Sequence, residues 1–260
     1  MKKILILFCG LILSFGMVFG ADFRFVQVDS LQLSANDEKS VQNMQNIIKN
    51  INNLKNVEFV VFSGDNIGSP KKENLECLIK NAKNLKKPYY IVLGSKDVSK
   101  SKHFGKKEYL KILTTKTKTH KKIISSNYVI EKKNLVFIVL DGSKNVITTP
   151  NGYYNEKTLD WLENQLSIYA DKKVIIFQHF PIISPNKKES RQTFKPERYL
   201  ELLENYKNVK AIFAGNFNVN SEKEVDKILH VTTANAPQYR VVDIMDYETE
   251  NPTFWSVIKE

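Results

Sequence analysis

Cysteine is almost absent from this chain. Only Cys9 and Cys77 occur in 260 residues, and Cys9 lies in an apolar run at the N-terminus. A chain that loses this run on export keeps one thiol and cannot form an internal disulfide, so its stability must come from a hydrophobic core. Apolar residues flank Cys77 at helical spacing. We therefore expect Cys77 to be a small buried residue and not a nucleophile.

Arginine is also scarce. Of the 39 basic residues only four are Arg, against 28 acidic residues and a formal net charge of +11. Loss of Lys2 and Lys3 with the N-terminal run leaves 37 basic residues and a charge of +9. Nucleic-acid-binding surfaces usually combine Arg with aromatic side chains next to it, and no such interleaving occurs here. We therefore expect no nucleic-acid partner.

Long apolar runs are confined to the N-terminus. Residues 4–19 follow two lysines and end in small residues before Ala21, which is the pattern of a secretory signal peptide cut after Gly20. The run is shorter than the roughly 20 residues that a membrane-spanning helix needs. We expect residues 1–20 to be removed and 21–260 to form a single periplasmic or secreted domain without a stable membrane span. An uncleaved anchor is the alternative.

Strand-like and helix-like patterns alternate along the rest of the chain, which predicts an α/β fold. We expect helices over Ser40–Leu54, Glu73–Leu85 and Asn155–Ile168, and one starting at Tyr199–Leu203. We expect strands at Phe23–Val28, Phe59–Phe62, Tyr89–Leu93, Tyr128–Ile130, Leu135–Leu140, Val174–Phe177, Ala211–Ala214, His230–Thr233, Val241–Ile244 and Thr253–Ile258. The polar section 98–120 is predicted to be a solvated loop with one short helix around Tyr109–Leu113.

Polar residues follow five of the expected strands directly, in short loops. The stretches are Val26-Gln-Val-Asp-Ser-Leu-Gln-Leu33, Val60-Val-Phe-Ser-Gly-Asp-Asn-Ile-Gly68, Ile91-Val-Leu-Gly-Ser-Lys-Asp97, Val174-Ile-Ile-Phe-Gln-His-Phe-Pro181 and Ala211-Ile-Phe-Ala-Gly-Asn-Phe-Asn218. In an α/β fold, ligand sites form where the carboxyl ends of the strands meet. The five loops therefore predict one shared site.

In order and spacing these loops resemble the metal-binding motifs of the calcineurin-like metallophosphoesterases. The family patterns are Asp-x-His, Gly-Asp-x-x-Asp, Gly-Asn-His-Asp/Glu, a lone His and Gly-His-x-His. The similarity extends over essentially the whole mature chain, including 136–141, 152–166 and 228–243. The resemblance implies a four-layer αββα sandwich with a dinuclear metal site at the strand ends, where two cations clamp a phosphoryl group and activate a bridging water.

Most ligand positions that the resemblance implies are substituted. Ser30 and Gln32 stand in the first motif, Gly68 replaces the second acid of the second, Ser95 and Lys96 replace Asn and His in the third, and Asn216 and Asn218 replace two histidines in the last. Asp65, Asp97 and His179 keep the family identity. The resemblance thus assigns metal roles to Asp65, His179, Asn216 and Asn218, catalytic positions to Lys96 and Asp97, and binding positions to Ser30, Gln32 and Ser95.

The same residues also have simpler interpretations. Asp65 can be a turn residue that bonds nearby amides, and His179 a core histidine with satisfied nitrogens. Asp29 precedes Ser30, and strand alternation predicts that its side chain points to the opposite face. The remaining donors are then one carboxylate, one imidazole and a few neutral oxygens, too little charge for two divalent ions. We hypothesise that Lys96 neutralises Asp65 directly as an ion pair.

The favoured interpretation is an exported metallophosphoesterase-fold protein that has lost its dinuclear site and serves a binding or structural role. We expect no cofactor, or at most one weakly held divalent metal ion. The partner would be a protein or envelope component, bound through exposed loops such as the basic section Lys116–Lys122. One alternative is an active phosphoesterase for phosphate mono- or diesters with a single-metal site. A second is a cationic binder of envelope polyanions, which rests on net charge alone.

Overall fold

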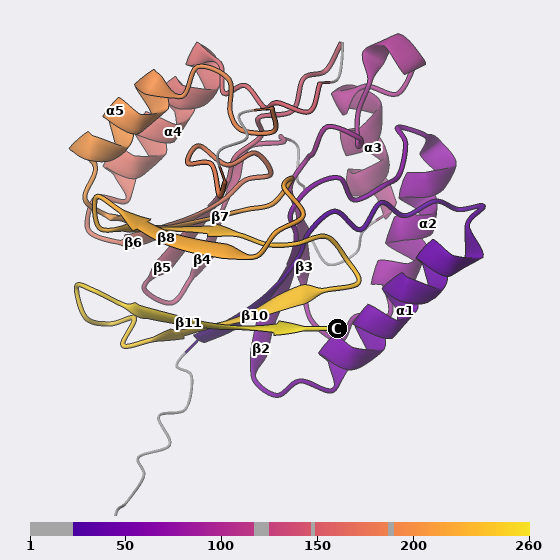
Figure 1. Ribbon diagram of the computed structural model, residues 1–260, viewed down its shortest axis with the longest axis horizontal. Helices are drawn as coiled ribbons and strands as arrows, with labels where there is room; N and C mark the ends of the chain where they lie inside the picture. The colour runs from indigo at the N-terminus through magenta and orange to yellow at the C-terminus, as the bar shows by residue number, and fades with distance from the viewer. Residues whose placement is uncertain (1–22, 117–124, 147–148, 187–189) are drawn as a thin grey trace, which may run out of the picture.

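The computed structural model describes residues 23–116, 125–146, 149–186 and 190–260 (Figure 1). The expected signal peptide and most of the section Lys116–Lys122 lie outside these residues. The elements, in chain order, are β1 (Phe23–Val28), α1 (Glu38–Asn52), β2 (Val57–Phe62), α2 (Lys72–Ala82), β3 (Tyr89–Ile91), a 3₁₀ turn (Lys100–Lys102), α3 (Lys106–Lys116), β4 (Tyr128–Lys132), β5 (Leu135–Val139), α4 (Glu156–Ile168), β6 (Lys173–Phe177), α5 (Glu197–Asn205), β7 (Val209–Ala214), β8 (Ser221–Val225), β9 (Ile228–Thr232), β10 (Tyr239–Met245) and β11 (Thr253–Lys259).

The strands form two sheets. One has the order β11-β10-β1-β2-β3 and the other β4-β5-β6-β7-β9-β8. In the first sheet β1, β2 and β3 are parallel, β10 runs antiparallel to β1, and β11 runs antiparallel to β10. In the second sheet β5, β6, β7 and β9 are parallel, and the edge strands β4 and β8 are antiparallel. The parallel strands of each sheet therefore end at a common edge.

Helices cover the outer faces of both sheets and complete the four layers that the sequence predicts. In Figure 1, α1, α2 and α3 lie beside the first sheet, and α4 and α5 beside the second. Alternation along β1 explains the layering: Phe25 joins the core between the sheets and Val26 the core beneath α1 and α2. The inter-sheet core is rich in phenylalanine, with Phe25 and Phe59 stacked at 5.5 Å. No helix within the described ranges has the length and apolarity required to cross a membrane.

Two elements differ from the sequence expectation. Strand β8, Ser221-Glu-Lys-Glu-Val225, was not predicted, because its side chains are largely exposed and show no apolar alternation. It is held by pairing with β9. Helix α3 runs over Lys106–Lys116 and is longer than the short helix expected. Tyr109 and Leu113 are buried, and Leu110 and Ile112 are partly buried. The remaining positions of α3 are polar, so the periodic signal covers only the middle of the helix.

Candidate functional site

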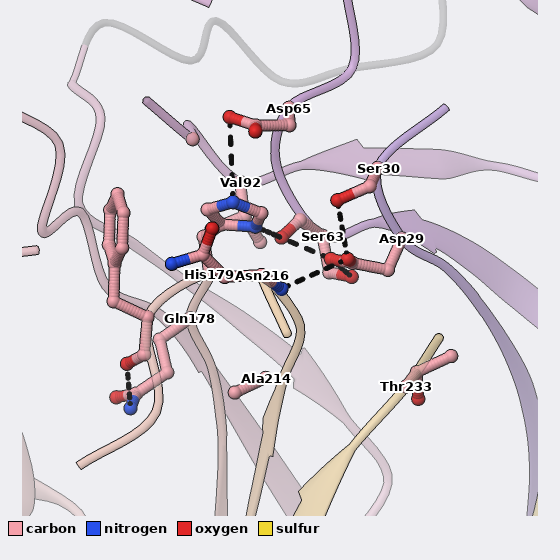
Figure 2. A network of polar contacts seen from close by, with 12 residues as sticks. Asp29, Ser30, Ser63, Asp65, Val92, Gln178, His179, Ala214, Asn216 and Thr233 are labelled. Atoms are coloured by element: carbon pink, nitrogen blue, oxygen red, sulfur yellow. Dashed lines mark hydrogen bonds and ion pairs between the residues drawn. The ribbon is translucent and has the colours of Figure 1, made fainter. Parts of the chain in front are cut away.

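The loops after β1, β2, β6 and β7 meet where the parallel strands of the two sheets end (Figure 2). Backbone and side-chain hydrogen bonds join them across the sheets. The Gln27 side chain donates to the carbonyl oxygen of Ala214 at 3.0 Å, and the Gly215 amide donates to the carbonyl oxygen of His179 at 3.0 Å. The loop after β3 joins the same cluster through Asp65, as described below. The five loops therefore come together at one place in the fold.

His179 occupies the centre of this cluster and is fully buried. Its Nδ1 atom lies 2.8 Å from the carbonyl oxygen of Ser63 and 3.3 Å from Oδ1 of Asp29. Its Nε2 atom lies 3.4 Å from Oδ1 of Asp65, within ion-pair range but without the geometry of a hydrogen bond. A carbonyl oxygen only accepts, so Nδ1 must carry a proton. The imidazole thus separates two carboxylates (Figure 2).

Asp29 points into the site, and the expectation that it points away is wrong. Strand β1 ends at Val28, and Ser30 has a φ of 47°, so strand alternation does not extend past Val28. The Asp29 carboxylate accepts from Ser63 Oγ at 2.8 Å, from Ser30 Oγ at 2.7 Å and from the Asn216 amide at 3.2 Å. The site therefore holds a carboxylate that sequence reasoning did not count.

Asp65 is anchored from the loop after β3. Its Oδ1 accepts from the Lys96 backbone amide at 2.8 Å and from Ser95 Oγ at 3.1 Å. Burial by itself would raise the pKa of Asp65, but the positive charge of His179 and the amide hydrogen bond outweigh burial and lower this pKa to about 2. Burial likewise would lower the pKa of His179, and the charges of Asp65 and Asp29 overcome it and hold that pKa well above its usual value. The two carboxylates therefore favour the protonated form of His179.

The Lys96 ammonium does not pair with Asp65, contrary to the hypothesis drawn from the sequence. It donates instead to the side-chain oxygen of Gln32. No ion pair between Lys96 and Asp65 occurs within the part of the chain that is described, although the lysine charge adds a small lowering of the pKa of Asp65. His179, and not Lys96, is the basic side chain beside the Asp65 carboxylate. The ring of His179 lies between the strand ends, whereas Lys96 lies at the margin of the site.

Asp97 braces two of the loops. Its carboxylate accepts from the amides of Gly94, Asn66 and Ile67, at 2.7, 2.9 and 3.1 Å, and from the Asn66 side chain at 3.0 Å. Complete burial and the nearby charge of Asp65 raise the pKa of Asp97 to about 7, and the amide donors oppose this shift. All four donors belong to the protein's own loops, so Asp97 positions the loop around Asp65.

The two asparagines of the last motif separate in the structure. The Asn216 side-chain amide donates to the carbonyl oxygens of Pro150 and Arg191 at 2.8 and 2.6 Å, which ties the site to a neighbouring loop. Asn218 is exposed, and its side-chain oxygen accepts from the Asn235 amide at 3.2 Å. Asn218 therefore takes no part in the cluster around His179.

Left-handed backbone conformations occur in three of these loops. They occur at Ser30, Gln32, Asp65, Asn216 and Asn218, all with φ between 47° and 68°. Such conformations cost about 1 kcal/mol or more at non-glycine residues and persist where surrounding contacts hold them. Gly64 has a φ of 108°, and a Cβ there would clash with the His179 ring. A Cβ on Gly215 would overlap the Asp29 carboxylate. The strained loops close tightly on the imidazole.

These residues do not fit a dinuclear metal centre. Asp29 and Asp65 lie on opposite sides of the ring, so they cannot share an ion while His179 stays in place. Among the described residues no group of three or more His, Cys, Asp or Glu side chains is arranged to hold a metal. Nε2 of His179, a buried atom without a hydrogen-bond partner, and the facing Asp65 carboxylate could hold one cation between them.

A groove of about 320 Å³ adjoins the site and is lined by Ser95, Lys96, Lys102 and Thr149, among others. His179 and Asp29 do not line it. A ligand in the groove would meet hydroxyl groups and ammonium groups, which bind anions. It would not meet a base placed to activate water.

Comparison with known proteins agrees with this architecture. The family model for calcineurin-like phosphoesterases matches residues 37–215. A "Probable glycerophosphodiester phosphodiesterase GpdQ" from Arcobacter nitrofigilis is 33% identical over 116 residues, which make up 44% of this chain and 41% of that protein, so the likeness spans about two fifths of the relative.

Two solved structures have the same fold. A dimetal phosphatase from Danio rerio superposes with a TM-score of 0.67 at 13% identity, covering 90% of this chain and 98% of that one. GAP50, the anchor in the inner membrane complex of Plasmodium, gives 0.57 at 18% identity, covering 82% and 71%. At these identities the likeness concerns the fold alone. Because the family model matches more than half of the sequence, this chain belongs to the calcineurin-like phosphoesterase family.

Proposed function

We propose that this protein has lost the dinuclear metal site of its family and serves a binding or structural role. The observation that supports this is the position of His179, whose ring lies between Asp29 and Asp65 with Nδ1 directed at a carbonyl oxygen. An imidazolium there supplies one positive charge between two carboxylates. It takes over, without a metal, part of the charge balance that two divalent ions would provide.

The substitutions around His179 support the same proposal. The polar atoms of Ser30 and Ser63 are used on Asp29, and those of Ser95 and the Lys96 amide on Asp65. Each carboxylate is thus satisfied by the protein itself, which removes the need for a metal. The fold also occurs in GAP50, described as an anchor, which is an example of this architecture in a protein named for attachment.

We also propose that the protein acts outside the cytoplasm, after cleavage following Gly20. The support is the N-terminal sequence pattern. The partner would be a protein or an envelope component, bound without a cofactor. N-terminal sequencing of the protein purified from its own envelope fraction checks this part. A mature chain beginning at Ala21 is expected, and an intact Met1 in the soluble cytoplasmic fraction would contradict it.

A second candidate function is phosphate ester hydrolysis at a single-metal site. One observation favours it: Nε2 of His179 is buried without a hydrogen-bond partner and faces the Asp65 carboxylate at 3.4 Å, a separation that two ligands of one ion also show. Two protein ligands are few for a retained metal. Such an ion would supply Lewis-acid chemistry.

An assay of the purified chain from Ala21 onward distinguishes the two candidates. Aryl phosphate mono- and diesters are supplied with Mn²⁺ or Mg²⁺, and turnover is measured for the native sequence and for Asp65→Asn. The proposal predicts no turnover above the rate of buffer with metal in either protein. Turnover that disappears in Asp65→Asn would establish the single-metal enzyme and refute a binding or structural role.

A further inference from the structure

We infer that a cleft at the amino-terminal ends of β7 and β9 binds an amphiphilic anion with a single negative charge. Two cavities meet there, an outer cavity of about 460 Å³ and an inner cavity of about 590 Å³, and both are lined by Lys210, Lys227 and Asn251. These three residues, the junction of the cleft, come from the start of β7, the turn before β9 and the connection between β10 and β11. No lining residue belongs to the five loops around His179, so the cleft is separate from the site described above.

The junction provides hydrogen-bond donors with positive charge. Its side chains are two ammonium groups and one amide, and no carboxylate lines both cavities. Within the described residues, the side chains of Lys210, Lys227 and Asn251 form no ion pair or hydrogen bond with the rest of the protein. Ammonium and amide N–H groups are the donors that carboxylate, sulfonate and phosphate oxygens accept from. The junction is therefore the place for an anionic head group.

Carboxylates elsewhere in the cleft limit the charge of the ligand. Asp226 and Glu250 line only the outer cavity, and Glu224 lines only the inner cavity. The two lysines of the junction can balance one negative charge, whereas a group with several negative charges would also be repelled by these acids. A singly charged anion therefore fits the cleft better than a polyanion does.

The outer cavity provides an apolar wall beside the junction. Leu203, Val209 and Ile228 line it, and all three are buried members of the core beneath α4 and α5. Tyr206 lines the same cavity. A volume of several hundred cubic ångströms, mostly apolar walls and a few polar groups at one end are typical of sites for small molecules. An aliphatic chain in the outer cavity would bury its CH₂ groups while its head group stays at the junction.

The turn that carries Lys227 gives independent support. Asp226 and Lys227 connect β8 to β9, where Val225 pairs with Ile228, and their φ angles are 52° and 66°. Two-residue hairpin turns with positive φ at both positions favour Asn-Gly or Asp-Gly, so a lysine at the second position is strained. Strained residues of this kind are concentrated at binding sites, where the side chain has a role that glycine lacks. The turn holds Lys227 at the cleft.

Titration calorimetry of the chain from Ala21 onward with dodecanoate, kept below its micellar concentration, tests the inference. We expect saturable binding of one dodecanoate per chain. Lys210→Gln and Lys227→Gln each remove a charge-assisted hydrogen bond and should weaken binding by at least about tenfold. Lys157→Gln, an equal change of charge at an exposed position of α4, is the matched control and should leave binding unchanged. Absence of saturable binding, or equal weakening in all three variants, would overturn the inference.

A series of ligands provides a second measurement that needs no variant to fold. From hexanoate to decanoate, the affinity of the native chain should rise about threefold to fourfold with each added CH₂ group, because each group is buried in the outer cavity. Dodecyltrimethylammonium has the same apolar chain as dodecanoate with a positive head group, and it should not bind. An affinity that is independent of chain length, or equal binding of the cationic amphiphile, would contradict the assignment of the cleft.

Discussion

The Nδ1 atom of His179 lies 3.3 Å from Oδ1 of Asp29, and the two buried side chains come from the ends of strands in different sheets. The contact joins the two halves of the sandwich at the point where the family places its metals. On the other side of the ring, Nε2 faces Asp65 at 3.4 Å. The ring of His179 therefore lies between two carboxylates, and their charges favour its protonated form.

Replacement of His179 by Asn should destabilise the fold strongly. The variant removes the cation and leaves Asp29 and Asp65 buried without it, and breaking a buried ion pair by removing one partner costs about 3–5 kcal/mol. The free energy of unfolding in urea measures the loss. His103→Asn is the matched control, because His103 is exposed and already has a left-handed φ of 58° that Asn tolerates. It should change stability by less than about 0.5 kcal/mol. Equal effects of the two variants would refute the buried charge.

The pH dependence of stability should carry the signature of His179. Its pKa in the folded protein is raised well above 6.5, so the folded state holds the proton more tightly. The contribution is fully present below pH 6.5 and is lost as pH rises through the raised pKa. Asp65, whose pKa is lowered to about 2, contributes stability that is present above pH 3.8 and lost as pH falls toward 2. The difference in unfolding free energy between the native chain and His179→Asn, measured across pH, shows the contribution of His179. A difference that grows with alkaline pH would contradict it.

Gly215→Ala should disturb the cluster around His179 at the Asp29 carboxylate. Its Cβ would overlap the Asp29 carboxylate, which cannot retreat because Ser63, Ser30 and the Asn216 amide bond to it. We expect a loss of about 1–3 kcal/mol in urea unfolding. Gly105→Ala is the control, because a Cβ there would lie 3.0 Å from its nearest atom, against 1.8 Å at Gly215. In a protein that already carries Asp29→Ala, Gly215→Ala should cost less unfolding free energy. If the losses from the two substitutions simply add, the clash is not with Asp29.

Most of the fold follows from the sequence. The alternation along Phe23–Val28 and the continuous apolar run of Phe59–Phe62 predict their strands, because buried strands need such side chains on both faces. Strand β8 is not predicted by its side-chain pattern, because backbone pairing with β9, and not side-chain burial, holds it in place. The extent of α3 is missed for a different reason: its apolar residues are confined to Tyr109–Leu113, and both of its ends are polar.

The site is predicted less completely. The order of the loops places Asp65, Ser95 and His179 together, and the structure agrees. The orientation of Asp29 depends on where β1 stops and on the positive φ of Ser30, neither of which leaves a mark in residue type. Ser63 was likewise not singled out, although its hydroxyl and carbonyl groups bond to Asp29 and His179. The position of Asp29, one residue before the place of the Asp in the motif Asp-x-His, is the signal that could have indicated this carboxylate.

Removal of the Asp97 carboxylate should loosen the loops without changing the charge of His179. Asp97→Ala leaves three buried amides and the Asn66 side chain without their acceptor, and each unsatisfied group costs about 1–3 kcal/mol before water enters. We expect a loss of at least about 3 kcal/mol in urea unfolding, and faster hydrogen exchange at Asn66 and Ile67. Asp171→Ala, at an exposed residue, is the control and should have little effect. A small, equal effect at both positions would show that Asp97 is not a brace.

Thermal unfolding with and without metal tests the central claim most directly. An ion that binds the folded state raises its stability in proportion to the logarithm of its free concentration, so a retained metal site makes the melting temperature depend on metal and chelator. The chain from Ala21 onward is scanned with excess Mn²⁺, with excess Zn²⁺ and with EDTA. If the His179 imidazolium balances Asp29 and Asp65, the melting temperatures are the same in all three. A melting temperature that rises with either metal and falls in EDTA would contradict the account.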